Sequence, residues 1–144
     1  MTRTGRAAAL RAVDRRFPEF KGALCELVRV PGVSAAGFPP DGLRRSAGVT
    51  GDVLGRLGVE NVAILNLPGV PPYVYGDWLH APGAPTVLVY GHHDVVPPGP
   101  PGEWTSPPFL PVERKGRLYG RGTADDKGGF LAWVAGAAAY LGTA

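Results

Sequence analysis

The stretch PTVLVYGHHDVVPPG, residues 85–99, joins a continuous apolar run to a short cluster of polar side chains. The run, residues 85–91, has the length of a strand and lacks the alternation of a half-exposed one, so it predicts a central strand covered on both faces. His92 and Asp94 follow at its carboxyl end, and positions two apart in an extended chain point to the same side. Because open α/β sheets bind ligands at the carboxyl ends of their strands, this stretch predicts both an α/β fold and the place of a site.

Helices and antiparallel strands are expected around this run. Apolar residues recur at helical spacing after Pro18 and again after Asp41. β-rich runs separated by proline and glycine predict antiparallel pairs. The order of elements predicts an α/β sandwich built on a mixed sheet. The expected elements are a helix over 18–30, a helix from Asp41 to Leu57, paired strands at 59–67 and 71–79, the central strand at 85–91, a hairpin over 109–122 that turns at Lys115-Gly116, and a helix over 126–142 capped by Asp125 or Asp126.

Composition and charge exclude several classes of protein. The 144 residues have room for one domain, and the net charge of +3 is scattered, unlike the clustered basic face of a nucleic-acid binder. No apolar run approaches the ~18 residues of a membrane span. Cys25 is the only cysteine, so an intrachain disulfide is excluded and a reducing compartment is favoured. We therefore expect a cytoplasmic protein with no nucleic-acid or membrane partner.

A second polar cluster, LYGRGTADDKGG at residues 118–129, stands where the hairpin gives way to the last helix. Asp125 and Asp126 are adjacent acids. Aspartate at a helix start ordinarily caps exposed N–H groups, so capping is one interpretation and metal ligation is the other. The glycines lack the spacing of a dinucleotide-binding or P-loop phosphate cradle. Lys127 either pairs with an acid or is solvated.

The histidines also allow two interpretations. His92 and Asp94 form either a hydrogen-bonded surface turn or a metal-binding histidine with a carboxylate on its other ring nitrogen. His93 points to the opposite side and is expected to be structural, and His80 is expected to lie in an exposed turn. Two polar clusters at the ends of neighbouring strands favour the metal interpretation. An imidazole and a bridging carboxylate are the ligand chemistry of two-metal hydrolases.

The sequence resembles the two-zinc metallopeptidase family of aminoacylases, glutamate carboxypeptidases and carnosinase-type dipeptidases. The resemblance rests on VLVYGHHDVVPP and EWTSPPFLPVERKGRLYGRGTADDKGG. These match the family pattern of an apolar strand with G-H-x-D-V-x-P, then W-x-x-x-P-F, G-x-L-Y-G-R-G and D-D/M-K-G, in the family's order and spacing. The match is tight over residues 85–130 and looser over LCELVRVPGVS. It implies an incomplete zinc-peptidase-like α/β sandwich with a mixed central sheet flanked by helices.

The resemblance implies a role for each polar residue. His92 would bind one zinc ion, Asp125 would bridge two, Asp94 would be the catalytic-site carboxylate that holds His92, and Asp126 would support the site. The implied reaction is hydrolysis of an amide or peptide bond, of the dipeptidase or carboxypeptidase type, through a water that bridges two zinc ions. Co²⁺ or Mn²⁺ would be alternative metals. The implied substrate is a small peptide or an N-acyl amino acid, and the implied full-length relative is compatible with a homodimer.

The chain departs from the family pattern after Asp126, because residues 127–144 contain no Glu, Asp or His. The family's general base, its further ligands and its lid or dimerisation domain would follow this point. We therefore expect residues 1–144 to be the N-terminal part of a truncated catalytic domain. The isolated chain would then be an inactive fragment or a binding module. We also expect His92 and Asp125 to converge on one edge of the sheet.

Overall fold

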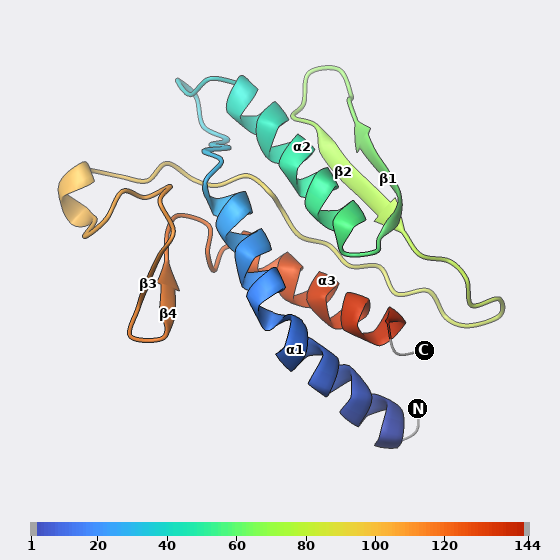
Figure 1. Cartoon of the computed structure of the whole chain (residues 1–144). Helices are drawn as coiled ribbons and strands as arrows, with labels where there is room; N and C mark the ends of the chain where they lie inside the picture. Colours follow the sequence, from blue (N-terminus) through green and yellow to red (C-terminus); the bar gives the residue numbers. More distant parts are fainter. Residues whose placement is uncertain (1–2, 143–144) are drawn as a thin grey trace.

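The residues that the structure describes form three α-helices and two small antiparallel sheets, which confirms the predicted α/β class (Figure 1). The computed structural model describes residues 3–142. The elements are α1 (Arg3–Val28), α2 (Asp41–Arg56), β1 (Glu60–Leu65), β2 (Tyr73–Asp77), the 3-10 turn η1 (Pro101–Glu103), β3 (Val112–Arg114), β4 (Arg117–Tyr119) and α3 (Lys127–Leu141).

Helix α1 begins at Arg3, so the start predicted at Pro18 is wrong, and Pro18 lies inside the helix. A proline in a helix interior lacks the N–H for one intrahelical hydrogen bond. The helix continues through it because the preceding turns are rich in alanine, the strongest helix former. Ala9 and Ala12 are also buried, so tertiary packing holds the N-terminal half of the helix in place.

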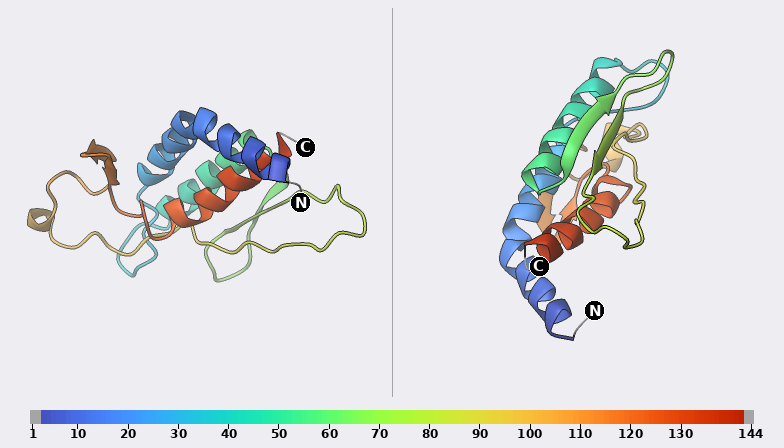
Figure 2. Two further views of the ribbon diagram at one scale, coloured as in Figure 1. Left: turned by 90° about the horizontal axis from the view of Figure 1, so that it is seen from below. Right: turned by 90° about the vertical axis from the view of Figure 1, so that its right-hand side faces the viewer.

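The hairpin β1–β2 lies on α2, and its pairing confirms the predicted antiparallel strands. Ala63 stands opposite Tyr75 in the register. Gly51 faces the hairpin, because a Cβ there would make an ordinary van der Waals contact with Val62 Cγ1 at 3.5 Å. The hairpin thus covers the face of α2 that points away from α1 (Figures 1 and 2).

The hairpin β3–β4 turns at Lys115-Gly116, as predicted. Both residues have positive φ angles, 52° and 72°, which a two-residue turn of type I′ requires. Gly120 follows the hairpin and packs against α1, since a Cβ at this position would lie 2.8 Å from Val28 Cγ1. This close packing holds the chain between β4 and the aspartate pair against the end of α1.

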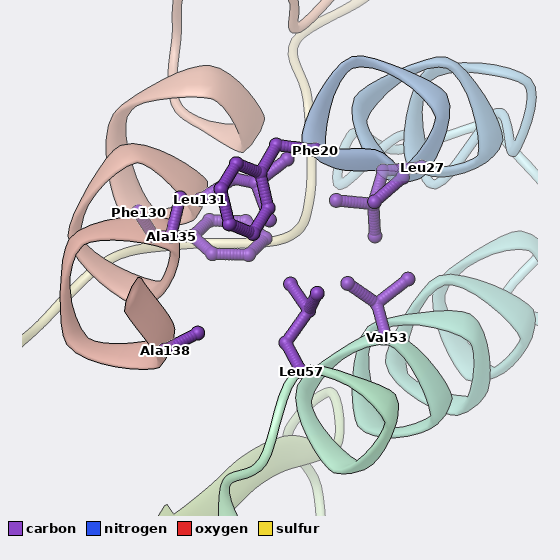
Figure 3. Close-up of a cluster of buried hydrophobic side chains, with 9 residues drawn as sticks. Phe20, Leu27, Val53, Leu57, Phe130, Leu131, Ala135 and Ala138 are labelled. Atoms are coloured by element: carbon purple, nitrogen blue, oxygen red, sulfur yellow. The ribbon is translucent and has the colours of Figure 1, made fainter. Parts of the chain in front are cut away.

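The hydrophobic core lies where the three helices meet, and Figure 3 shows its side chains pointing toward one another. Leu27 of α1 and Val53 of α2 are almost completely buried. Burying a side chain of this size contributes roughly 1.5–3 kcal/mol relative to leaving it exposed. The core therefore fixes the end of α1 against the start of α3, where both polar clusters lie. Its members are Phe20, Ala23, Leu27, Val53, Leu57, Phe130, Leu131, Ala135 and Ala138.

The segment 85–91 forms no strand, which corrects the predicted central strand. It runs as an extended chain between α3 and the β1–β2 hairpin (Figure 1). Val87, Leu88 and Tyr90 are 78%, 90% and 85% exposed, so the segment is not covered on both faces. A strand needs a neighbouring chain to accept and donate its backbone hydrogen bonds. Within residues 3–142, the strands pair only as β1–β2 and β3–β4, so the sequence signal of a buried strand has no partner here.

The contrast between Leu88 and Leu131 gives a matched test of this exposure. Leu131 is 4% exposed in the core. We expect Leu131→Ala to lower the free energy of unfolding by about 2–5 kcal/mol, whereas Leu88→Ala changes it by no more than about 0.5 kcal/mol. Urea denaturation of both variants measures the difference. Equal costs at the two positions would show that Leu88 is buried in solution.

Candidate metal centre

The structure brings His92 and Asp125 together, although His92 precedes the β3–β4 hairpin in the sequence and Asp125 follows it. His92 Nε2 lies 3.1 Å from Asp125 Oδ1. The carboxylate of Asp125 is 85% exposed, so one side of the pair opens to solvent. The two side chains thus form a partly open pair, the arrangement that an incoming ligand or cation can reach.

Asp94 occupies the other side of the His92 ring. His92 Nδ1 lies 3.1 Å from the Asp94 backbone oxygen and 3.3 Å from its Oδ1. Both atoms can only accept a hydrogen bond, so Nδ1 must carry the proton and donate it. With Nδ1 protonated, a neutral His92 presents a lone pair at Nε2 directly to the Asp125 carboxylate. Two lone pairs at this separation require a positive charge between them, either a proton or a metal ion.

The electrostatic surroundings of His92 favour a positive charge on its ring. Burial lowers the pKa of His92, but the Asp94 backbone oxygen and the carboxylates of Asp94 and Asp125 outweigh it and raise this pKa above its ordinary value. In the metal-free chain, the imidazolium therefore persists to higher pH than in a free histidine. A cation placed at Nε2 would have to displace that proton.

Asp126 joins the two polar clusters through the backbone. Its Oδ2 accepts a hydrogen bond from the His92 N–H at 3.2 Å. Asp126 occupies the N-cap position of α3, yet its side chain makes no capping hydrogen bond, because the carboxylate turns to His92 instead. The peptide bond between Asp125 and Asp126 is cis. Asp126 is therefore the N-cap by position only, and its carboxylate contacts the His92 segment.

Two glycines leave room for the Asp126 carboxylate. A Cβ at Gly91 would lie 2.8 Å from Asp126 Oδ2 and 2.6 Å from Phe130 Cβ. A Cβ at Gly129 would overlap Asp126 Oδ1. Because any larger residue would displace the carboxylate, these glycines permit the contact between the His92 segment and the start of α3.

The His92 segment has further anchors that the sequence did not reveal. Ser46 of α2 donates its hydroxyl hydrogen bond to the His93 backbone oxygen at 2.8 Å. His93 turns away from His92 and places Nε2 at 3.0 Å from the Pro72 oxygen, which fits its expected structural role. The buried face of α2 includes Ser46, Ala47, Thr50 and Val53. Helical spacing within this stretch was the signal that could have identified Ser46 as an inward-facing residue.

A short parallel bridge holds the other end of the segment. Val95 N–H donates to the Gly32 oxygen at 2.9 Å, and Ser34 N–H donates to the Val95 oxygen at 3.1 Å. The bridge pairs Val33 with Val95. Asp94 is therefore held one residue away from a fixed point next to the end of α1.

Lys127 is buried, so neither sequence interpretation of it holds. Its Nζ donates hydrogen bonds to the backbone oxygens of Leu27 and Val30, at 2.8 Å and 3.0 Å, rather than to an acid or to solvent. Burial lowers the pKa of Lys127 to about 8, and the nearby Asp94 carboxylate partly opposes this shift.

His80 lies outside this cluster. Its Nε2 lies 2.7 Å from Glu60 Oε2, in an exposed pair at the end of the β1–β2 hairpin. This position fits the predicted exposed turn. It also provides a second histidine–carboxylate contact with which the His92 pair can be compared.

The residues present fit one side of a zinc site. Imidazole nitrogen and carboxylate oxygen are both zinc donors, and His92 has the partner on its second nitrogen that metal-bound histidines require. Within residues 3–142, no group of three or more His, Cys, Asp and Glu side chains is arranged to hold a metal ion. The donor types therefore fit, while a complete site needs donors in addition to His92 and Asp125.

Two surface hollows among the described residues lie away from this pair, since neither is lined by His92 or Asp125. One is lined by Pro40, Leu43, Arg44, Gly69, Val70, Pro71 and Pro72, and the other by Pro101, Trp104, Thr105, Ser106, Pro107 and Pro108.

The three-dimensional match places this chain among α/β peptidase folds. It superposes on the dipeptidase Dug1p from Saccharomyces cerevisiae with a TM-score of 0.82 and 26% identity, covering 95% of this chain and 31% of that one. On human carnosine dipeptidase 1 the TM-score is 0.80 and the identity 32%, covering 94% of this chain and 31% of that one. The similarity thus includes nearly all of this chain and less than a third of each relative.

Residues 88–143 match the sequence profile of peptidase family M20/M25/M40, which confirms the predicted family resemblance. Over 62 residues the chain is 55% identical to a succinyl-diaminopimelate desuccinylase of Xylella fastidiosa and 53% identical to one of Stenotrophomonas maltophilia. Each alignment covers 43% of this chain and 16% of the relative. In the described residues, no helix combines the length and apolar character needed to cross a membrane.

The raised pKa of His92 gives a direct test of its contact with Asp125. Asp125→Asn removes a negative charge beside the ring, so we expect the pKa of His92 to fall. A pH titration of the His92 ring protons by NMR measures the change. Asp52→Asn, which removes an exposed carboxylate of α2, should leave the His92 titration unchanged. A His92 pKa that stays the same or rises in Asp125→Asn contradicts the contact.

Proposed function

We propose that this chain contributes part of the metal site of an amide- or peptide-bond hydrolase. His92 and Asp125 would be metal ligands, and Asp125 would bridge two zinc ions. Asp94 would hold the His92 ring by accepting the Nδ1 proton, and Asp126 would hold its backbone. The chain spans less than a third of the solved relatives that it matches, so the remaining ligands are expected from outside residues 3–142.

The separation of 3.1 Å between His92 Nε2 and Asp125 Oδ1 carries this proposal. Asp94 accepts the Nδ1 proton of His92, so Nε2 is the ring nitrogen that faces Asp125 Oδ1, where a proton or a metal ion can bind. The two atoms together therefore favour binding of a cation. Zinc bound here would polarise a substrate carbonyl and lower the pKa of a bound water toward ~7.

The names of the similar proteins support a substrate class. The similar proteins are named as dipeptidases and as desuccinylases of succinyl-diaminopimelate. We propose a small peptide or an N-acyl amino acid as the substrate class. The imidazole and carboxylate donors suit zinc, and they also admit Co²⁺ or Mn²⁺.

A second candidate is a chain that binds metal weakly or not at all and catalyses no reaction. The observation in its favour is that residues 3–142 present no group of three or more potential ligands. Two donors leave a zinc ion short of the four that a structural site uses. Zinc affinity and hydrolysis, measured on the same preparation, separate the two candidates.

Zinc binding tests the proposed ligands. We expect the chain to bind zinc, and His92→Ala to weaken binding by at least the roughly 10–100-fold that loss of a ligand's hydrogen-bond partner costs. Asp94→Ala should weaken it by roughly 10–100-fold, because it leaves the ring without its Nδ1 acceptor. Competition with a chromophoric chelator measures the affinities, and hydrolysis of dipeptides and N-succinyl amino acids is assayed in parallel.

His80→Ala is the matched control, because it removes a histidine–carboxylate contact of the same kind outside the site. We expect it to leave zinc affinity unchanged. Equal losses in His80→Ala and His92→Ala would contradict the assignment of His92. A zinc affinity that is negligible, or that His92→Ala leaves unchanged, would favour the second candidate.

A further inference from the structure

Lys127 is the largest fully buried side chain of the described residues, with 0% of it exposed. It is the first residue of α3. Two effects oppose an ammonium at this place: burial removes its hydration, and the N-terminal end of a helix carries a partial positive charge. Both effects destabilise a charged lysine here, so the hydrogen bonds of its Nζ must offset the loss of hydration and the repulsion from the helix end.

The ammonium satisfies the end of α1 instead. The carbonyls at a helix C-terminus lack intrahelical partners and carry partial negative charge. Helix α1 has no basic residue in its own last turn. Lys127 Nζ donates to the Leu27 oxygen at 2.8 Å and to the Val30 oxygen at 3.0 Å. The first residue of α3 thus supplies the cation that the end of α1 lacks.

From Val30 a chain of backbone hydrogen bonds leads to the His92 segment. The Val30 oxygen also accepts the Gly32 N–H at 2.9 Å, and the Gly32 oxygen accepts the Val95 N–H at 2.9 Å. Val95 directly follows Asp94, whose carboxylate contacts His92 Nδ1. Lys127 is therefore connected to the Nδ1 side of His92 by two intervening hydrogen bonds.

The stem of Lys127 packs on the same segment. A Cβ at Gly122 would lie 3.2 Å from Lys127 Cδ and 2.8 Å from Val95 Cγ1. Gly122 also has a φ of 87°, which favours glycine. The lysine stem and Val95 therefore meet over a position that has no side chain, and this packing limits how far the two segments can separate.

We infer that Lys127 is a positioning residue, whose ammonium sets the distance between the segment that carries His92 and Asp94 and the turn that carries Asp125. The contacts form a closed ring. On one side, the backbone connects Lys127 to Asp125, whose carboxylate contacts His92 Nε2. On the other side, Asp94 contacts His92 Nδ1, and the hydrogen bonds of Val95 and Val30 connect Asp94 back to the ammonium. The effect on metal binding rests on the proposed function, whereas the effect on the backbone does not.

Lys127→Met tests the ammonium alone, because methionine keeps an unbranched apolar stem. The Leu27 and Val30 oxygens keep hydrogen bonds from Val30 N–H and Gly32 N–H, so no carbonyl loses its last partner. The variant also removes the cost of burying a charge, so we expect it to fold. Lys127→Gln, which keeps a shorter donor, is the second variant.

Amide hydrogen exchange followed by NMR reads out the two segments. In Lys127→Met we expect the Val95 amide to exchange about tenfold faster, while the Val53 amide in the core is unchanged. Zinc affinity should fall roughly tenfold. Lys21→Met is the matched control, since it removes an exposed ammonium that pairs with Glu113, and it should change neither readout.

Three results would overturn the inference: unchanged exchange at Val95, equal acceleration at Val95 and Val53, or global unfolding of both Lys127 variants. The last two would assign the ammonium to the core rather than to the site. If the unmodified chain binds no zinc, the proposed function fails, and exchange at Val95 still decides the role of Lys127.

Discussion

The hydrogen bond from the His92 N–H to the Asp126 carboxylate is the constraint on which the site depends. It joins two segments that are separated along the chain by the β3–β4 hairpin. Because Asp126 follows Asp125 directly, holding its carboxylate against His92 also brings Asp125 to the His92 ring. The contact requires a close approach of backbones, which the glycines at 91 and 129 permit.

The contacts on the two sides of the His92 ring set its protonation and the direction of its free nitrogen. Asp94 fixes the proton on Nδ1 and Asp125 faces Nε2. The same negative groups that raise the pKa of His92 would stabilise a metal cation at Nε2, since a proton and a metal compete for one lone pair. The two ends of the His92 segment are held by Ser46 and by the bridge between Val33 and Val95, so the ring is held from several elements at once.

The sequence predicted which polar residues lie together better than it predicted the fold around them. The structure places Asp94 and Asp125 on the two sides of the His92 ring, as the spacing of the two polar clusters led us to expect, and their role as a metal site stays a prediction. The prediction for segment 85–91 was wrong for a physical reason. Its apolar run suits a strand buried between two neighbours, and no strand of the described residues pairs with it.

Helix α1 and Lys127 show the same limit of sequence reasoning in two other forms. Pro18 predicts a helix start from local geometry, but buried alanines before it extend the helix to Arg3. Lysine is ordinarily a surface residue, but Lys127 is buried because its ammonium donates hydrogen bonds to carbonyls 97 and 100 residues away. Such long-range partners have no signature in the local sequence.

Anomalous diffraction at the zinc absorption edge, from crystals of the chain grown with zinc, shows whether His92 and Asp125 bind a metal ion together. We expect an anomalous peak at the pair formed by His92 Nε2 and the Asp125 carboxylate. Peaks at His80 and Glu60 alone, or a metal-free pair with His92 and Asp125 turned apart, would contradict it.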